Sequence, residues 1–318
     1  FIRRYTLFKK NWVKFIIMVF LFTAVTSPFV VLFGPFNNVK RAVIGAILQS
    51  RHPQYITWLF SNDELQSILG TVGVVKSQDL FKFNAREDKD LKLEKIESSR
   101  YVGYVLEIPD PRRIQVATAA NIQEKGDTTS NIAKMNGAVA AINGGGFHDP
   151  NGTGTGRLPY GFILHEGDYI IGKDVGPDES VDFVGFSKSG NLIAGNYDKT
   201  ELADMKAMEG ITFGPPLIVD GKKMITDGDG GWGVGPRTAI GQRKDGTVLF
   251  VVIDGRQPGY SLGATLRDVQ DVLYEKGAYI AANLDGGSSS TLYLNGKVVN
   301  KPADLLGERM IPTAFIVK

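Results

Sequence analysis

The sequence predicts an α+β fold, in which a mixed, largely antiparallel β-sheet core has flanking helices and follows one N-terminal transmembrane helix. Three observations lead to this prediction. Residues 15 to 36 are nearly all apolar and carry no charge. From residue 101 onward, short apolar runs alternate with turn dipeptides, which is typical of antiparallel strands. In that region only residues 129–136 and 265–276 place apolar side chains at helical spacing.

The first 36 residues predict a retained signal anchor. About twenty apolar residues span a bilayer, and five basic residues with no acid precede residue 15. The positive-inside rule keeps such an N-terminus in the cytoplasm, so we expect a single-pass protein of the cell membrane with an extracellular domain. A cleaved signal peptide, with its shorter apolar core, is the alternative. Since residue 1 is Phe, we expect the natural chain to begin further upstream.

Residues 37–75 predict a helical juxtamembrane stalk. Val43 and Ile47 belong to a run at helical spacing, Pro53 interrupts it, and Ser61 is placed to cap a later helix. The main domain then covers residues 76–318 and begins with a charged, loose linker at 76–95. Pro28 inside the apolar span favours a kink, which is compatible with a membrane-protein partner packed against the anchor helix.

Strands dominate the expected secondary structure of the main domain. They are expected at residues 101–108, 114–117, 137–142, 161–165, 169–171, 217–219, 248–253, 279–283 and 313–317. Hairpin dipeptides punctuate these runs, at Glu166-Gly167, Asp220-Gly221, Asp245-Gly246 and Asn295-Gly296. The amphipathic helix at 265–276 is expected to end at Gly277.

Charge and cysteine content exclude little. The chain has a net charge of +2, but its first 36 residues contribute five cations, which leaves the rest with 31 basic and 34 acidic residues. A slightly acidic domain does not favour nucleic acid as a partner. Cysteine is absent, which fits a bacterial surface protein without disulfides and fits a cytosolic protein equally well.

The most informative motif is the run Asn283-Leu284-Asp285-Gly286-Gly287-Ser288-Ser289-Ser290-Thr291. It follows a strand-like run and joins one carboxylate to two glycines and four hydroxyl residues. Glycines permit a sharp turn close to a ligand, and consecutive backbone N–H groups can form an anion-binding concavity. The pattern indicates chemistry on a phosphorylated or sugar substrate. A Ser-rich hairpin turn is the alternative interpretation.

Three further segments place polar groups where a buried strand stops, a common location for functional sites. They are residues 141–149 (Ala-Ile-Asn-Gly-Gly-Gly-Phe-His-Asp), 235–241 (Gly-Pro-Arg-Thr-Ala-Ile-Gly) and 251–256 (Val-Val-Ile-Asp-Gly-Arg). Together with residues 263–266 (Gly-Ala-Thr-Leu) and 308–314 (Glu-Arg-Met-Ile-Pro-Thr-Ala), they resemble the phosphodiester glycosidase family from about residue 91 to residue 317. The resemblance implies a hydrolase that cleaves the glycosidic bond of sugar-1-phosphate diesters.

Cleavage of such a diester requires a carboxylate to activate water or attack C1, and cations to hold the phosphate. Asp285 and Asp254 each end a strand-like run and are the expected catalytic pair. Because arginine binds phosphate oxygens bidentately, Arg237 and Arg256 are the expected clamps. A divalent cation bridging Asp254 or Asp285 is the one cofactor that the sequence leaves open.

The other candidate residues are expected to bind the substrate. Gly144, Gly145, Gly286, Gly287, Ser288 and Ser289 offer backbone or hydroxyl donors, His148 lies inside a motif, and Asn143 and Asn283 offer amides for sugar hydroxyls. Turn capping is the alternative role for both asparagines, and a structural role is the alternative for His148.

An anchored domain that faces outward meets envelope material, so the expected substrate is a sugar-phosphate-linked envelope or exopolysaccharide polymer. Two other functions stay open at this point. The same site could transfer a glycosyl or glycosyl-phosphate unit to another acceptor, or the protein could be a non-catalytic polysaccharide-binding or assembly protein of a membrane complex.

Overall fold

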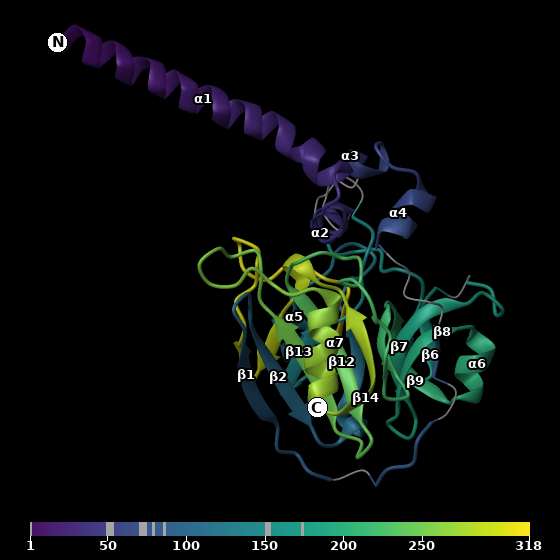
Figure 1. Cartoon of the computed structure of the whole chain (residues 1–318). Helices are drawn as coiled ribbons and strands as arrows, with labels where there is room; N and C mark the ends of the chain where they lie inside the picture. Colours follow the sequence, from purple (N-terminus) through teal and green to yellow (C-terminus); the bar gives the residue numbers. More distant parts are fainter. Residues whose placement is uncertain are drawn as a thin grey trace.

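The computed structural model describes residues 2–48, 54–69, 75–77, 80–84, 87–149, 154–172 and 175–318. Pro53, expected to interrupt the stalk helix, lies outside the described residues. Helix α1 (Ile2–Phe33) projects away from the rest of the chain (Figure 1). Its segment Trp12–Phe33 has a mean hydropathy of 2.5 and no buried side chain, so by length and composition it can cross a membrane. A helix of this kind near an N-terminus acts as a signal sequence or as an anchor.

Most of the described residues between 37 and 75, called the stalk here, are helical. The stalk contains α2 (Asn37–Leu48), α3 (Gln54–Thr57) and α4 (Asn62–Leu69) around a small core of its own, formed by Ile44, Ile56 and Leu65. The expected cap of α4 is present, because the Ser61 backbone N–H donates to the Glu64 carboxylate (2.8 Å) and the Glu64 N–H donates to Ser61 Oγ (3.3 Å).

A seven-stranded sheet forms the centre of the main domain. Its order is β1 (Lys92–Glu97), β2 (Val102–Ile108), β13 (Val248–Ile253), β12 (Arg237–Arg243), β14 (Ala278–Leu284), β10 (Pro216–Val219) and β11 (Lys222–Lys223). All six residues of β13 are buried, which explains why this strand is a continuous apolar run rather than an alternating one.

Two five-stranded sheets complete the domain. One has the order β16 (Lys297–Val298), β15 (Leu292–Leu294), β4 (Ala140–Asn143), β17 (Thr313–Val317) and β3 (Ile114–Thr118). The other has the order β6 (Asp168–Ile171), β5 (Ile163–His165), β9 (Ala207–Thr212), β7 (Val181–Ser187) and β8 (Leu192–Tyr197). One apolar cluster draws residues from all three sheets, including Phe250, Phe315 and Phe186, so the sheets share a single main core.

Helices cover the outer faces of the sheets. Helix α7 (Leu266–Glu275) lies over the seven-stranded sheet (Figure 1). Its residues Leu266, Val269 and Leu273 pack against the face of that sheet that is turned away from the main core. Helix α5 (Thr129–Met135) covers the sheet that contains β4 and β17, and α6 (Lys199–Asp204) covers the third sheet.

The α+β class, the antiparallel sheet and the flanking helices are confirmed. Every strand pairing among the described residues is antiparallel, so the parallel pairs that a mixed sheet would contain do not appear there. Strands β7, β8 and β9 and helix α6 were not expected from the sequence. The expected linker also ends earlier than predicted, because β1 begins at Lys92.

Candidate active site

The ends of four strands converge at one edge of the domain. Antiparallel pairing places Leu284 at the end of β14 opposite Thr238 near the start of β12, and Arg237 opposite Ile253 at the end of β13. The end of β4 joins them from the neighbouring sheet, because the Asp285 N–H donates to the Gly144 carbonyl (3.0 Å). Motifs that are far apart in the sequence therefore meet at one place.

Asp285 lies at the centre of this edge. Burial raises the pKa of its carboxyl group to about 6, against an ordinary value of 3.8. The charges of Arg309 and Arg256 and the Gly286 N–H act in the opposite direction and lower this pKa. The Ser289 hydroxyl also lowers it, although its Oγ has no hydrogen bond of ordinary geometry with a described residue. Such a carboxyl group changes charge near neutral pH, which suits acid–base or nucleophilic chemistry.

Arg256 is held against the glycine turn that follows Asp285. A Cβ at Gly287 would lie 3.2 Å from both Nη1 and Nη2 of Arg256, which is a tight contact, and Gly287 has a φ of +63°, so glycine suits this position in both respects. Arg256 itself has a φ of +58°, a left-handed conformation that is strained for a residue with a side chain. Backbone strain of this kind clusters at functional sites.

Arg237 is buried and is bonded mainly to the main chain. Its Nε donates to the Ala264 carbonyl (3.0 Å), and its Nη2 donates to the carbonyls of Trp232 (2.7 Å) and Gly233 (2.6 Å). Burial, and then the charge of Arg256, lower its pKa to about 10. Arg237 therefore contributes a positive charge to the site. Its guanidinium, which is expected from the sequence to bind phosphate, instead bonds to two loops and positions them.

The carboxylate of Asp254 is also occupied. It accepts hydrogen bonds from Asn300 Nδ2 (2.9 Å), the Tyr260 hydroxyl (2.9 Å) and the Lys301 N–H (3.0 Å). Burial raises its pKa, and these donors lower it. The same Asn300 amide donates to the Ser290 carbonyl (3.0 Å), so Asp254 is tied to the loop after Asp285 through one side chain. These contacts favour a positioning role.

The expected donors of the 141–149 segment are largely used within the fold. Asn143 Nδ2 donates to the Asp285 carbonyl (2.5 Å), and its Oδ1 accepts from the Thr238 hydroxyl (2.7 Å) and the Thr291 N–H (3.1 Å). The N–H groups of Gly144 and Gly145 donate to the carbonyl and the hydroxyl of Thr313, at 2.8 and 3.0 Å. Asn143 therefore joins the two sheets directly under Asp285.

The remaining candidates differ in their surroundings. Asn283 Nδ2 donates to the Gly214 carbonyl (3.0 Å), and its buried Oδ1 has no described partner. The exposed His148 ring packs edge-on against Tyr160, with ring centroids 4.4 Å apart. In the Gly286–Ser289 turn, the Gly287 N–H is bonded to the Pro236 carbonyl (2.9 Å), whereas no described residue accepts from the Ser288 N–H.

Two residues near Asp285 were missed as site residues. Arg309 donates to Asp149 (2.8 Å), stacks over the Phe147 ring at 4.7 Å, and has a buried Nε without a described partner. Burial and the charge of Asp285 raise the pKa of Tyr160. Arg309 lies in a quoted motif, so an arginine search over all motifs would have found it. Tyr160 carries no sequence signal.

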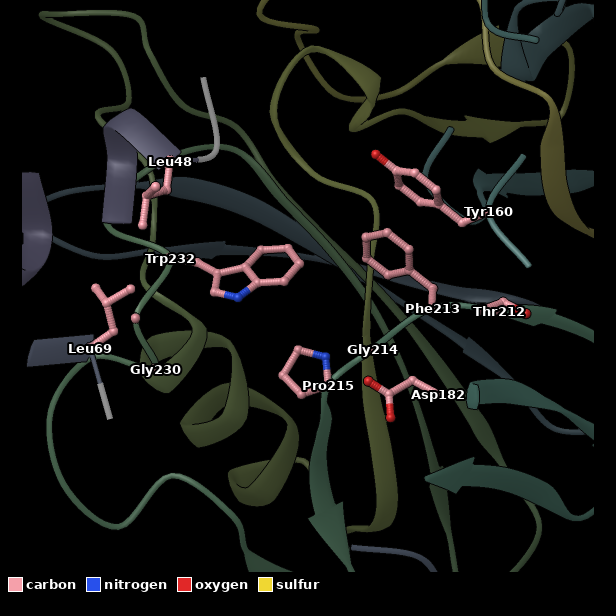
Figure 2. A pocket seen from close by; sticks show the side chains of 11 residues that line it. Leu48, Leu69, Tyr160, Asp182, Thr212, Phe213, Gly214, Pro215, Gly230 and Trp232 are labelled. Carbon is pink, nitrogen blue, oxygen red and sulfur yellow. The ribbon is translucent and has the colours of Figure 1, made fainter. Parts of the chain in front are cut away.

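A cavity of about 500 Å³ adjoins this edge through Tyr160, whose N–H donates to the Gly146 carbonyl (3.1 Å). Figure 2 shows the residues that line it. Its aromatic residues are Tyr160, Phe213 and Trp232, and the Phe213 and Trp232 rings meet edge-on with centroids 6.0 Å apart. In the described part of the chain, no group of three or more His, Asp or Glu side chains is arranged to hold a metal ion. The divalent cation at Asp254 or Asp285 stays a prediction.

Residues 136–318 match the family model described as phosphodiester glycosidase. The chain belongs to the phosphodiester glycosidase family. It is 32% identical over 197 residues to the SPbeta prophage-derived uncharacterized protein YomE of Bacillus subtilis (strain 168), which covers 60% of this chain and 29% of that protein. It is 25% identical over 203 residues to the N-acetylglucosamine-1-phosphodiester alpha-N-acetylglucosaminidase of Bos taurus, which covers 58% of this chain and 36% of that enzyme. The chain therefore spans about a third of the length of these two relatives.

Solved structures of other proteins share the phosphodiester glycosidase fold of this chain. The catalytic domain of zebrafish N-acetylglucosamine-1-phosphodiester alpha-N-acetylglucosaminidase, auto-inhibited by its pro-peptide, superposes with a TM-score of 0.63. It is 22% identical, and the match covers 77% of this chain and 89% of that one. A hypothetical protein from Synechocystis gives a TM-score of 0.50 at 17% identity, covering 72% of this chain and 62% of that chain.

Proposed function

We propose that this phosphodiester glycosidase cleaves the bond between C1 of a sugar and a phosphodiester, with Asp285 as the essential carboxylate. Burial raises the pKa of the Asp285 carboxyl group to about 6, although the charges of Arg309 and Arg256 act to lower it. This combination of a buried carboxyl group and two nearby cations is the observation that carries the proposal. The ionised carboxylate activates water or attacks C1, and the guanidinium groups bind the phosphate. Because a phosphomonoester is a good leaving group, the reaction does not require a strong general acid.

The contacts of four neighbouring residues indicate how each of them would support Asp285. Arg237 adds a buried positive charge, and the Ser288 N–H, which has no acceptor among the described residues, is available to a phosphate oxygen. Asp254, predicted as the second catalytic carboxylate, fits better as the residue that positions the 286–291 loop through Asn300. Asn143 has the same kind of role beneath Asp285.

The substrate and location are the finer parts of the proposal. The names of the bovine and zebrafish relatives specify an N-acetylglucosamine-1-phosphodiester, which makes N-acetylglucosamine 1-phosphate diesters the first compounds to test. The apolar helix α1 supports a membrane anchor with the catalytic domain outside the cell. Such a domain would act on a sugar-phosphate polymer of the envelope or an exopolysaccharide.

The test is incubation of the full chain in detergent with the methyl phosphodiester of N-acetylglucosamine 1-phosphate, following free sugar and methyl phosphate together. We expect both products in equal amounts, and we expect Asp285→Asn to lose at least about a hundredfold in turnover while staying folded. Asp227→Asn is the matched control, since the Asp227 side chain is 89% exposed and lies on another loop.

Two outcomes would overturn parts of the proposal. Full activity in Asp285→Asn would reject the carboxylate mechanism. A folded wild type that binds the diester without turnover would favour the binding-protein alternative. For location, a reporter fused after Lys318 should be active only in a form that works outside the cytoplasm, and cytoplasmic activity would reject the anchor and the polymer substrate.

A further inference from the structure

The cavity beside Tyr160 is built by two parts of the chain. Phe213, Pro215 and Trp232 line it from the main domain, whereas Leu48 and Leu69 line it from the ends of α2 and α4 in the stalk. In Figure 2 the two leucines lie on the opposite side of Trp232 from Tyr160. The stalk lies outside residues 136–318, so this wall is not part of what the chain shares with the family model.

Close backbone contacts hold the stalk in place. A Cβ at Gly45 of α2 would lie 2.4 Å from the Gly231 carbonyl oxygen, so α2 and the 227–233 loop touch main chain to main chain. Arg41 Nε donates to the Ile68 carbonyl (2.6 Å), which ties α2 to α4, and its Nη1 lies 3.7 Å from the Asp227 carboxylate. The leucine wall is therefore a fixed part of the cavity.

The lining indicates the chemistry of the ligand. The described residues that line the cavity include no lysine or arginine, so none of them offers the cation that favours a phosphate. Asp182 accepts one hydrogen bond from Asn196 through Oδ1 (3.1 Å), and no described donor reaches its Oδ2. Asp182 is exposed and also lines the cavity, so an apolar chain bound there would remove water from its carboxylate without supplying a donor. A sugar ring instead offers hydroxyl donors to Asp182 and a C–H face to the aromatic rings.

The position of the cavity indicates which sugar it takes. The reacting C1 has to touch Asp285, and Asp285 is not among the lining residues. Tyr160 links the two places, since it lines the cavity and its N–H donates to the Gly146 carbonyl (3.1 Å), two residues after the Gly144 carbonyl that accepts from the Asp285 N–H. A volume of about 500 Å³ is within the range of small-molecule sites.

We propose that the stalk and the main domain together form a subsite for an uncharged sugar unit that neighbours the reacting sugar of the substrate. This inference rests on the proposed glycosidase function. The phosphodiester binds at the arginines beside Asp285, and the neighbouring ring occupies the cavity that Asp182, Trp232 and the stalk leucines line. A uronic acid unit is disfavoured there because its carboxylate would face that of Asp182.

The experiment uses the full chain in detergent and two substrates. The short one is the methyl phosphodiester of N-acetylglucosamine 1-phosphate, and the long one carries a second neutral sugar on the N-acetylglucosamine. We expect the long substrate to have a KM lower by about tenfold. Leu48→Trp, which fills the cavity from the stalk, should remove this advantage without changing the kinetics of the short substrate. Leu59→Trp, on the surface of the stalk, should keep it.

A second variant protects the test against local misfolding of the stalk. Asp182→Asn removes the charge but keeps the size of the side chain. Wild type should prefer the long substrate with a neutral second sugar over one with a uronic acid in that position, and the variant should reduce this preference by about tenfold. Unchanged ratios of long to short substrate in Leu48→Trp and unchanged discrimination in Asp182→Asn would overturn the subsite. If wild type hydrolyses neither substrate, the glycosidase proposal fails separately, and calorimetric binding of the neutral disaccharide, lost in Leu48→Trp, still decides the subsite.

Discussion

Arg237 and Trp232 are joined by a hydrogen bond of 2.7 Å, from the guanidinium Nη2 to the main-chain carbonyl. The same guanidinium bonds the carbonyls of Gly233 and Ala264. The aromatic wall of the cavity and the cation beside the catalytic edge are thus linked through one side chain. Changing Arg237 therefore has effects on both places.

Arg237→Lys should lower stability as well as activity. Lysine keeps the charge but lacks the planar fork whose separate Nε and Nη2 atoms reach carbonyls of two loops, and each charged hydrogen bond contributes about 1.5 to 3 kcal/mol. We expect a clear drop in melting temperature and in kcat/KM. Arg112→Lys, in the partly exposed pair with Asp110, should change stability much less, because water screens that pair. Equal stability of wild type and Arg237→Lys would contradict the structural role of the guanidinium.

Activity should rise with pH through the ionisation of Asp285. With a folded-state pKa of about 6, kcat/KM should be half-maximal near pH 6 and level above pH 7. A pKa above the ordinary 3.8 also means that ionisation is disfavoured in the folded state, so stability should fall as pH rises from about 4 to about 6. Melting curves of Asp285→Asn should lack that fall. A flat rate profile between pH 5 and 7 would rule out this assignment.

Arg309→Gln should move the rate profile to higher pH. The charge of Arg309 lowers the pKa of Asp285, so its loss should raise this pKa and shift the midpoint upward. Arg309→Lys keeps the charge and should keep the midpoint closer to that of wild type, although it loses the stacking on Phe147. Identical midpoints in both variants would show that Arg309 does not act on Asp285 electrostatically.

Arg256 allows strain to be separated from function. Its φ of +58° is tolerated by glycine and costs other residues about 1 to 2 kcal/mol. Arg256→Gly should therefore be more stable than Arg256→Ala by about 1 kcal/mol, whereas both should lose the same large part of their activity. The measurements are chemical denaturation and kcat/KM. A difference in activity between the two variants would mean that the backbone conformation, not the guanidinium, matters for turnover.

Much of the fold is predictable from local sequence. Strand β13 is a buried apolar run bounded by turns, and α7 has both a capping box at Thr265 and an ending glycine. Strands β7 and β9 are less visible because they include Gly185 and Gly210, which lie where the backbones and Phe183 approach closely. Their pairing is settled by packing against the common core, which no short window of sequence contains.

Only part of the candidate site, likewise, is predictable from the sequence. A carboxylate before two glycines at a strand end selects Asp285 as a candidate without a structure. The same rule selects Asp254, but Tyr260, Asn300 and Lys301 reach its carboxylate from two other loops. Sequence position alone cannot show that the Asp254 carboxylate is occupied by donors from distant loops. Tyr160 enters the site only because the fold brings its loop to Gly146.

The close contact between the main chains at Gly45 and Gly231 limits how the stalk could be exchanged for another segment. Two main chains that touch have no side chains through which they could adapt independently. A chimera that joined this domain to a different anchor would retain Asp285 and its arginines but would lack the wall formed by Leu48 and Leu69. Stalk and domain must therefore be exchanged between proteins as one unit if preference for longer glycans is to travel with the chemistry.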